Sequence, residues 1–429
     1  MSVVAGPALV DRTPLWVGVF ASFAILVLWT QAQPFASLSD YGVLDDPTQS
    51  NALRRNLTLV IMAIALLLVW RSGQGTRLWQ AVSPGLMAIF IWFAATSVLS
   101  PSPGLALNRL ALAGIVIAIA LCLPLLFARA EDFVTMLGVT VSIAIALCFL
   151  GVLFAPDLAI HSLRDAVEQG LAGDWRGMFR HKNDLAPMAI HFSFVGLLLW
   201  RLGQRGWGGA IMIGALVLLV QSGGKSAALL LVPALLGAAL IVRLRPVAAT
   251  TVAVLIVGGL ALVTVGSVAF PVVASVVQHL PDPSFTGRAD IWQLALAAAE
   301  TRPLTGFGYT IFWDTGITYA IAGSGDTAAQ VSHAHNGFLE VALSAGVPGL
   351  LLVLGWAGIA PLRHIQTIAA RVMTADERVF LEFLVQGWLF TLLISSLEAV
   401  LFNRGDSIWF TGLLSIICLR LWSKSALAK

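Results

Sequence analysis

The sequence predicts an all-α, polytopic integral membrane protein, and its composition carries this expectation. Of its 429 residues, 58% are hydrophobic and only 11% are charged, whereas soluble domains carry about 25% charged residues. The mean hydropathy of +0.89 agrees with this imbalance. So few charges cannot cover a water-facing surface, which excludes an ordinary cytosolic enzyme, a secreted disulfide scaffold and a disordered chain. Helices are favoured because they satisfy their own backbone groups inside lipid.

Reading between charges and turn-forming residues gives about 12 candidate membrane spans, since a spanning helix needs about 20 apolar residues. The candidates are residues 14–31, 57–70, 86–99, 106–127, 133–154, 185–201, 208–221, 226–242, 247–277, 337–360, 379–402 and 407–421. We therefore expect one integral membrane domain over residues 1–429, with both termini on the same side of the membrane. The distribution of Lys and Arg among the loops favours the cytoplasm as that side.

Two long loops are then expected on the outer side of the membrane. They cover residues 155–183 and 278–336, the second lying between the ninth and tenth spans. Within the second loop, residues 288–300 have the apolar spacing of an amphipathic helix on the membrane surface. The first loop holds four cations that oppose the topology rule: Arg164, Arg176, Arg180 and Lys182. Basic residues in such a place need a reason, and binding an anion is the natural one.

The remaining composition excludes further classes of site. The formal net charge of +3 is too small to suggest nucleic-acid binding. Cys122, Cys148 and Cys418 lie in apolar runs without metal-ligand spacing, and their odd number gives no disulfide framework. The adjacent Asp45 and Asp46 are the nearest approach to an acidic metal motif and a weak one. We therefore expect neither a metal nor a cofactor.

The segment VSHAHNGFLEVALSAGVPG, residues 331–349, places His333 and His335 where an outer loop meets a span. Asn336 follows directly, and Glu340 lies about one turn into the helix. A neutral histidine at the interface can act as a general base. A helix cap or a lipid-headgroup contact is the commoner explanation for an isolated His-x-His. The spacing does not match the HExxH pattern of a zinc site.

The segment DWRGMFRHKN holds Arg176, Arg180 and Lys182 beside Asn183. Such groups can bind a phosphate or pyrophosphate through charge-assisted hydrogen bonds. Contact with anionic lipid headgroups, worth about 1 kcal/mol per cation, is an equal alternative on charge alone.

Three further cations are candidates for the same anion. Lys225 lies in QSGGKS, which is no Walker A motif because Leu219 stands where a glycine is required. Snorkelling is the commoner explanation for Lys225. Arg288 opens the predicted surface helix and can reach an anion or a headgroup. Arg404 can form a local ion pair with Asp406, which is worth little when exposed.

Three segments together resemble the O-antigen ligase and polymerase superfamily, which carries the Wzy-C domain. They are HAHNGFLEVALSAGVPGLLL, GRADIW with RPLTGFGY, and WRGMFRHKN, the last similar to a loop of exopolysaccharide polymerases. With the span count, the resemblance covers most of residues 90–420. It implies a GT-C-type membrane glycosyltransferase that takes glycan from undecaprenyl diphosphate. His335 matches the essential histidine, Arg288 matches a diphosphate-binding arginine, and Lys225 stands where ligases show an arginine.

We therefore expect polymerisation of undecaprenyl-diphosphate-linked oligosaccharide repeats into exopolysaccharide or O-antigen at the periplasmic face of a bacterial inner membrane. The reaction would be metal-independent and inverting, with His335 as general base. The residues expected to bind diphosphate or glycan are Arg176, Arg180, Lys182, Asn183, Lys225, Arg288, Asn336, Glu340 and Arg404. If the site is real, His335, Arg288, Lys225 and Arg180 should lie around one cavity.

Two other functions stay open at this point. A ligase would transfer the same glycan to lipid A-core, and only the acceptor would differ. A transporter or flippase of lipid-linked sugars would usually place charges at the membrane midplane, whereas the notable charges here gather near one face. Expected partners are the lipid-linked oligosaccharide, membrane lipids, and a flippase and chain-length regulator of the export pathway, without nucleic acid.

Overall fold

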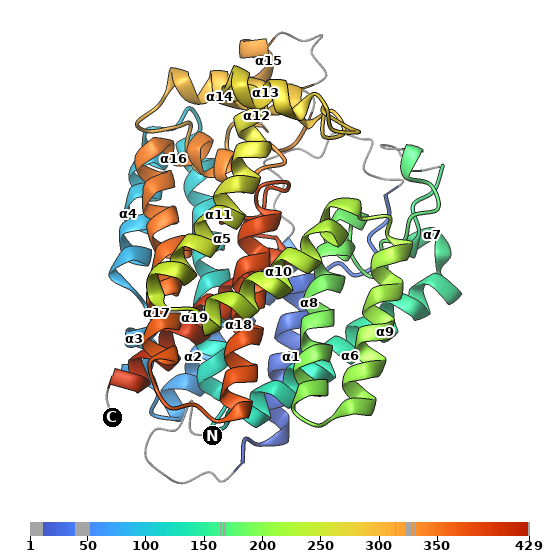
Figure 1. Cartoon of the computed structure of the whole chain (residues 1–429), viewed down its shortest axis with the longest axis vertical. Coiled ribbons are helices and arrows are strands. Elements are labelled where there is room, and N and C mark those ends of the chain that lie inside the picture. The colour runs from blue at the N-terminus through green and yellow to red at the C-terminus, as the bar shows by residue number, and fades with distance from the viewer. Residues whose placement is uncertain are drawn as a thin grey trace.

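The computed structural model describes residues 12–38, 52–163, 165, 169–313, 315–322, 328 and 331–427. Arg164, Asp45 and Asp46 lie outside these described residues. Within them the chain is helical apart from turns, loops and one isolated antiparallel bridge between Ile160 and Trp175. The all-helical prediction is therefore confirmed for the described part of the chain (Figure 1).

The helices follow one another with short connections. The first half contains α1 (Leu15–Trp29), α2 (Ala52–Arg71), α3 (Gly75–Ala81), α4 (Pro84–Val98), α5 (Pro103–Cys122), the 3₁₀ helix η2 (Leu123–Leu126), α6 (Ala130–Phe154), α7 (Pro156–Ala159), η3 (Gln169–Leu171), α8 (Lys182–Arg201) and α9 (Arg205–Gln221). The second half contains α10 (Lys225–Arg243), α11 (Pro246–Val263), α12 (Val265–Ala269), α13 (Pro271–Val277), α14 (Arg288–Thr301), α15 (Ile317–Ala322), α16 (Gly337–Val353), the π-helix η5 (Leu354–Ile359), α17 (Ala360–Ala369), α18 (Ala375–Ile394) and α19 (Ser407–Leu427).

Six of the described helices are long and apolar enough to cross a membrane, judged by length and composition. They are α2, α5 with η2, α6, α10, α11, and α16 continued through η5 and α17. Counting α3 and α4 as one span bent by 67° gives up to seven, and α1 and α9 are shorter apolar helices. These helices support a multi-pass membrane protein. The figure of about 12 spans and the GT-C type stay predictions.

Local sequence explains where several helices begin. Ser83 caps α4 by accepting a hydrogen bond from the Leu86 amide, and a proline occupies the first helical position. Thr374 and Glu377 form a capping box at the start of α18. Asn336 caps α16 by accepting from the amides of Phe338 and Leu339. These caps satisfy amides that have no partner within the first turn of a helix.

The predicted span over residues 247–277 is wrong as a single helix, because the structure divides it into α11, α12 and α13. Thr264 has non-helical dihedral angles, and Phe270 is extended directly before Pro271. A proline lacks the amide that would continue the ladder and disfavours helical geometry in the residue before it. The chain thereby leaves the bundle and continues into α13 and α14 at one end of it (Figure 1).

The predicted span over residues 379–402 also ends early, since α18 stops at Ile394. The carbonyl groups of Ser395 and Ser396 accept hydrogen bonds from the Gly337 amide at 2.7 Å and from Nδ2 of Asn336 at 2.9 Å. These carbonyl groups are thus satisfied by the start of α16 instead of by another helical turn. Residues 395–406 form turns that enter the protein and return to α19.

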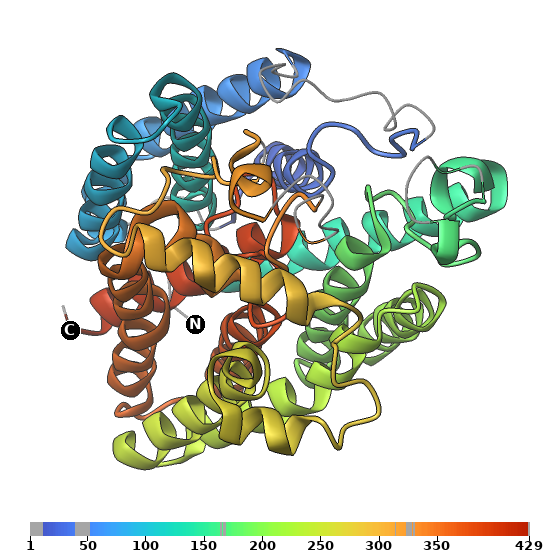
Figure 2. The same ribbon diagram turned by 90° about the horizontal axis from the view of Figure 1, so that it is seen from above.

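The predicted helix over residues 288–300 is confirmed as α14. Its apolar residues Ile291, Trp292 and Leu294 are buried, and the indole nitrogen of Trp292 donates to the Ala334 carbonyl at 3.1 Å. Seen from above, α14 lies across the end of the bundle, with the C-terminal helices α18 and α19 in the middle (Figure 2). The start of α1 and the end of α19 lie at the opposite end (Figure 1).

A kink in α16 fixes the loop that follows α14. Gly346 has a φ of 66° within α16, and the Val347 amide donates to the Pro303 carbonyl at 2.7 Å. Gly306 approaches so closely that an added Cβ atom would lie 2.5 Å from the Leu343 carbonyl oxygen. Only glycine fits such an approach, and this packing holds the loop after α14 against α16, which directly follows His335 and Asn336 (the His-Asn segment).

Candidate functional site

His335 lies at the centre of a chain of contacts that joins three distant segments. Its Nδ1 atom lies 3.0 Å from Oε2 of Glu398, in the turn after α18. The other oxygen of Glu398 accepts from Nη2 of Arg288, the first residue of α14, at 2.6 Å. The side chains of Arg288, Glu398 and His335 are only 13%, 12% and 23% exposed. Arg288 and His335, which belong to different segments of the sequence, therefore meet on one carboxylate.

The charge state of Glu398 decides the tautomer of His335. Burial raises the pKa of Glu398, but the hydrogen bond from His335 and the charge of Arg288 outweigh burial and lower the pKa to about 2. An ionised carboxylate can only accept hydrogen bonds, so Nδ1 of His335 carries the proton that points to it. In the neutral imidazole, Nε2 then has no proton and can act as a base. His335 also has a φ of 45°, in the left-handed region.

His333 has the opposite tautomer. Its Nδ1 atom accepts from the His335 amide at 3.3 Å, and the two rings lie 4.1 Å apart between centroids. Burial and then the charge of His335 lower the pKa of His333 to about 3. The ring is therefore neutral at ordinary pH and holds its proton on Nε2, as a donor.

Asn336 and Glu340 hold this short segment in place. The Asn336 side chain is buried, accepting from two amides of α16 and donating to the Ser396 carbonyl. Oε1 of Glu340 accepts from the Ala334 amide at 2.5 Å. In this structure both side chains position His335 between α16 and the turn after α18.

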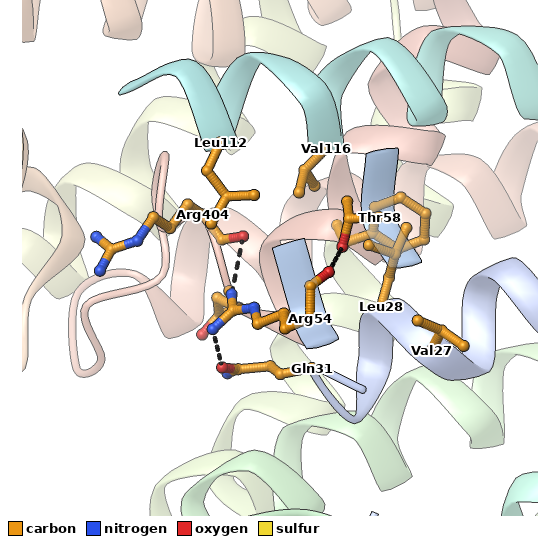
Figure 3. Close-up of a pocket in the computed structure, with 11 residues that line it drawn as sticks. Val27, Leu28, Gln31, Arg54, Thr58, Leu112, Val116 and Arg404 are labelled. Carbon is orange, nitrogen blue, oxygen red and sulfur yellow. Dashed lines mark hydrogen bonds between the residues drawn. The ribbon is translucent and has the colours of Figure 1, made fainter. Parts of the chain in front are cut away.

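Arg404 follows Glu398 in the same turn and reaches a separate cavity. Its Nη1 atom donates to Oγ1 of Thr310 at 2.9 Å, and Arg404 lines a cavity of about 120 Å³ together with His333 and Glu340. The Arg404 carbonyl accepts from Nη2 of Arg54 at 3.5 Å. Figure 3 shows the Arg404 side chain pointing away from the small pocket that Arg54 and Gln31 line.

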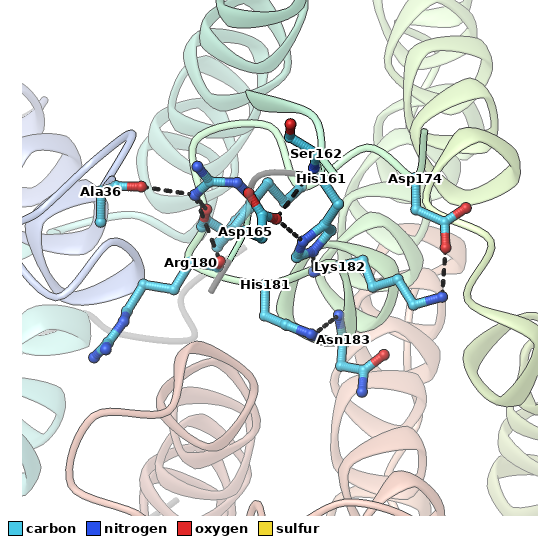
Figure 4. A network of polar contacts seen from close by, with 11 residues as sticks. Ala36, His161, Ser162, Asp165, Asp174, Arg180, His181, Lys182 and Asn183 are labelled. Atoms are coloured by element: carbon cyan, nitrogen blue, oxygen red, sulfur yellow. Dashed lines mark hydrogen bonds and ion pairs between the residues drawn. The ribbon is translucent and has the colours of Figure 1, made fainter. Parts of the chain in front are cut away.

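The predicted cations of the 155–183 loop differ from one another in their surroundings (Figure 4). Arg176 is fully buried and its Nη1 atom donates to the Ala36 carbonyl at 2.9 Å, so it braces the loop against residues after α1. Nζ of Lys182 lies 2.5 Å from Oδ2 of Asp174 in a largely buried ion pair. The Arg180 side chain points away from both contacts (Figure 4).

Histidines organise the end of this loop. Nδ1 of His161 lies 3.0 Å from Oδ2 of Asp165, and Nε2 of His161 accepts from the Lys182 amide at 3.2 Å. Nδ1 of His181 accepts from the Asn183 amide at 3.0 Å and caps α8. This contact uses the backbone of Asn183, which was expected to bind glycan.

The 155–183 loop reaches the neighbourhood of His335. The charge of His181 acts on His333, and the charges of Asp184 and Glu398 are close enough to interact. The end of the 155–183 loop and the segment around His335 are therefore close enough to interact electrostatically.

Lys225 is the first residue of α10, and its exposed ammonium group forms no ion pair or hydrogen bond within the described part of the chain. The turn before it contacts the 155–183 loop, because the Trp175 amide donates to the Gln221 carbonyl at 2.9 Å. A Cβ atom added to Gly223 would lie 2.8 Å from Oδ1 of Asp174. The turn that precedes Lys225 thus lies beside the Asp174–Lys182 pair.

Comparison with known proteins bears on the same segments. Residues 210–354 match the family model described as O-antigen ligase. The resemblance to the O-antigen ligase and polymerase superfamily is confirmed. The exopolysaccharide production protein ExoQ of Rhizobium meliloti is 31% identical over 203 residues, which cover 41% of this chain and 43% of that protein. The aligned part is thus less than half of the relative's length.

Glu398 is the functional candidate that the sequence analysis missed. The family match ends at residue 354 and does not reach it. Its signal was an acidic residue inside an apolar run, which is expensive in a membrane protein and commonly marks a functional site. Within the described ranges, no group of three or more His, Cys, Asp or Glu residues could hold a metal ion.

Proposed function

We propose that this protein is a membrane glycosyltransferase that polymerises undecaprenyl-diphosphate-linked oligosaccharide repeat units. The observation that carries the proposal is the contact chain Arg288–Glu398–His335, which places an oriented base next to a cation. A base alone would suit many reactions, but a base beside a phosphate-binding group suits displacement of a phosphate ester. The family match and the ExoQ relative supply the glycan chemistry.

In the proposed reaction, Nε2 of His335 takes the proton of an acceptor hydroxyl. The hydroxyl oxygen attacks the anomeric carbon, and the bond from that carbon to the diphosphate oxygen breaks. Undecaprenyl diphosphate leaves with the electron pair, and the anomeric centre inverts. General base catalysis of this kind contributes about 10²–10⁴-fold.

Glu398 and Arg288 support this step in different ways. Glu398 fixes the tautomer of His335 and stabilises the imidazolium that forms, as a carboxylate does in hydrolase triads. A guanidinium has five N–H donors, and the Nη2 contact with Glu398 leaves others of Arg288 for diphosphate oxygens. Charge-assisted bonds to the leaving group stabilise the charge that develops on it.

The proposed orientation places this site at the periplasmic face of a bacterial inner membrane, with both termini in the cytoplasm. It is supported by the position of α14 and the His335 segment at the end of the bundle opposite the start of α1 and the end of α19 (Figure 1). The distribution of Lys and Arg agrees with it. A flippase and a chain-length regulator are the partners that such a pathway would require.

An O-antigen ligase is the second candidate, and the description of the matching family model favours it. Purified protein incubated with lipid-linked repeats alone distinguishes the two reactions. Elongation of the glycan without further acceptor supports a polymerase, and product that appears only after lipid A-core is added supports a ligase. Movement of the lipid-linked sugar across liposomes without any covalent change would instead indicate a transporter.

A further inference from the structure

The cavity of about 120 Å³ beside His333 has no assigned role in the reaction described above. Three of its aromatic side chains come from the loop after α14 and from the turn after α18: Tyr309, Trp313 and Phe402. Its polar side chains include Thr310, Glu340 and Arg404. The cavity therefore combines flat apolar faces with a few fixed polar groups, which is the usual composition of a small-molecule site.

The charges around the cavity do not suit a diphosphate. The lining residues include the cation of Arg404 and the carboxylate of Glu340, whose charges are opposite. Oγ1 of Thr310 already accepts a hydrogen bond from Arg404. Arg288, which is bound to Glu398, does not line this cavity. A neutral ligand fits these surroundings better than an anion with several charges.

A sugar ring has the matching chemistry. One face of a pyranose is a patch of C–H groups that packs on an aromatic ring, and its rim carries hydroxyl groups that both donate and accept. His333 presents an N–H donor because its Nδ1 atom already accepts from the His335 amide. The indole N–H of Trp313, in the cavity wall, has no hydrogen-bond acceptor in the described part of the chain. A hydroxyl that reaches this donor after a small shift of the ring would satisfy it.

The position of His335 indicates which sugar this would be. His335 contacts Glu398, which also pairs with Arg288, and the His335 ring lies 4.1 Å between centroids from the ring of His333, which lines the cavity. The base is therefore next to both the Arg288–Glu398 pair and a residue of the cavity wall. A donor held by its diphosphate at Arg288 and an acceptor held in the cavity would meet at His335.

We propose that the cavity lined by Trp313, Tyr309, His333 and Arg404 binds one sugar ring of the acceptor glycan and presents its hydroxyl to His335. The proposal rests on the proposed glycosyl transfer and adds the place of the acceptor to it. Trp313 provides the face on which the ring packs, and His333 acts as a positioning residue through its Nε2–H group.

The test uses lipid-linked repeats extracted from cells that lack this protein, and the soluble oligosaccharide that mild acid releases from the same lipids. The soluble oligosaccharide competes as an acceptor in the elongation assay with purified protein. For the Trp313→Leu variant we expect the inhibition constant of the soluble oligosaccharide to rise about tenfold, the effect of one lost contact of moderate strength. The rate at saturating substrate should change little. Trp313→Phe keeps an aromatic ring, so its inhibition constant should lie between those of Trp313→Leu and wild type.

Two controls separate this proposal from the function on which it rests. Trp79→Leu removes an exposed tryptophan on α3 and should leave the inhibition constant unchanged. Calorimetry measures binding of the soluble oligosaccharide to the His335→Ala variant in the absence of turnover. If adding Trp313→Leu to this variant abolishes the binding, the result supports the acceptor site even when wild-type protein does not elongate the glycan. The acceptor-site proposal would be overturned by an unchanged inhibition constant in folded Trp313→Leu and Trp313→Phe. It would also be overturned if these variants had a lower maximal rate but unaltered affinity for the oligosaccharide.

Discussion

Nδ1 of His335 and Oε2 of Glu398 lie 3.0 Å apart although 63 residues separate them in the chain. The contact exists because α18 ends at Ile394 and the following turn enters the protein beside the start of α16. Glu398 contacts His335 with one oxygen and Arg288 with the other. One carboxylate thus couples the proposed base to the proposed diphosphate-binding cation.

Replacing Glu398 with Gln tests this coupling. The neutral amide stabilises the imidazolium far less than a carboxylate and removes the negative charge that pairs with Arg288, so we expect the elongation rate to fall by on the order of 10²–10⁴-fold, the usual contribution of an oriented base. The rate should be compared at equal amounts of folded protein, judged by size-exclusion profile. A Glu398→Gln variant with nearly wild-type turnover would show that the carboxylate does not orient His335.

The low pKa of Glu398 also makes stability depend on pH. Its pKa is about 2 in the folded protein against an ordinary value of 4.5. A pKa lowered by folding contributes stability that is fully present above the ordinary value and is lost as the pH falls towards the folded value. We expect the melting temperature of wild type to approach that of Glu398→Gln as the pH decreases from about 5 to about 3. A constant difference over this range would contradict the assignment.

Arg288 tests the role of the cation. Lysine keeps the charge of arginine but loses the planar array of donors. We expect Arg288→Lys to raise the KM for lipid-linked repeats by about tenfold, with a larger effect for Arg288→Gln. Arg363→Gln, which removes an exposed cation in α17, is the matched control and should keep the wild-type KM. Equal KM values for all three variants would argue against diphosphate binding at Arg288.

Glu382 should matter for stability and not for turnover. It is buried in α18, where it forms an ion pair with Arg201 of α8. Nη2 of Arg243 in α10 lies 2.8 Å from Oε1 of Glu382, which is a second ion pair without hydrogen-bond geometry. Because both arginines are partly exposed, we expect Glu382→Gln to cost about 1–3 kcal/mol, less than the loss of a fully buried pair. Thermal unfolding measures this change. A large loss of activity per folded molecule would contradict a purely structural role.

Much of the fold could be predicted from the sequence because its signals are local. Apolar runs predicted most helices, and the spacing of apolar residues predicted α14. The His-Asn segment and Arg288 were predicted as parts of one site, and the structure joins them through Glu398. Each of these predictions depends on composition within about one helix length.

The remaining features depend on contacts between distant segments. The early end of α18 follows from hydrogen bonds that Gly337 and Asn336 donate to carbonyl groups some 60 residues away. The residues next to Ile394 do not predict it. The loop cations illustrate the same limit. Charge alone cannot show that Lys182 is paired with Asp174 or that Arg176 is buried against Ala36.

The elongation rate of purified His335→Ala on lipid-linked repeats tests the proposed base most directly. His364→Ala, which removes a histidine bound to Ser423 between α17 and α19, is the control for loss of an imidazole elsewhere. We expect His335→Ala to fold and bind the lipid-linked substrate while elongation falls by at least about 10²-fold, with His364→Ala close to wild type. Polymer formed at the wild-type rate by folded His335→Ala would contradict the role of His335.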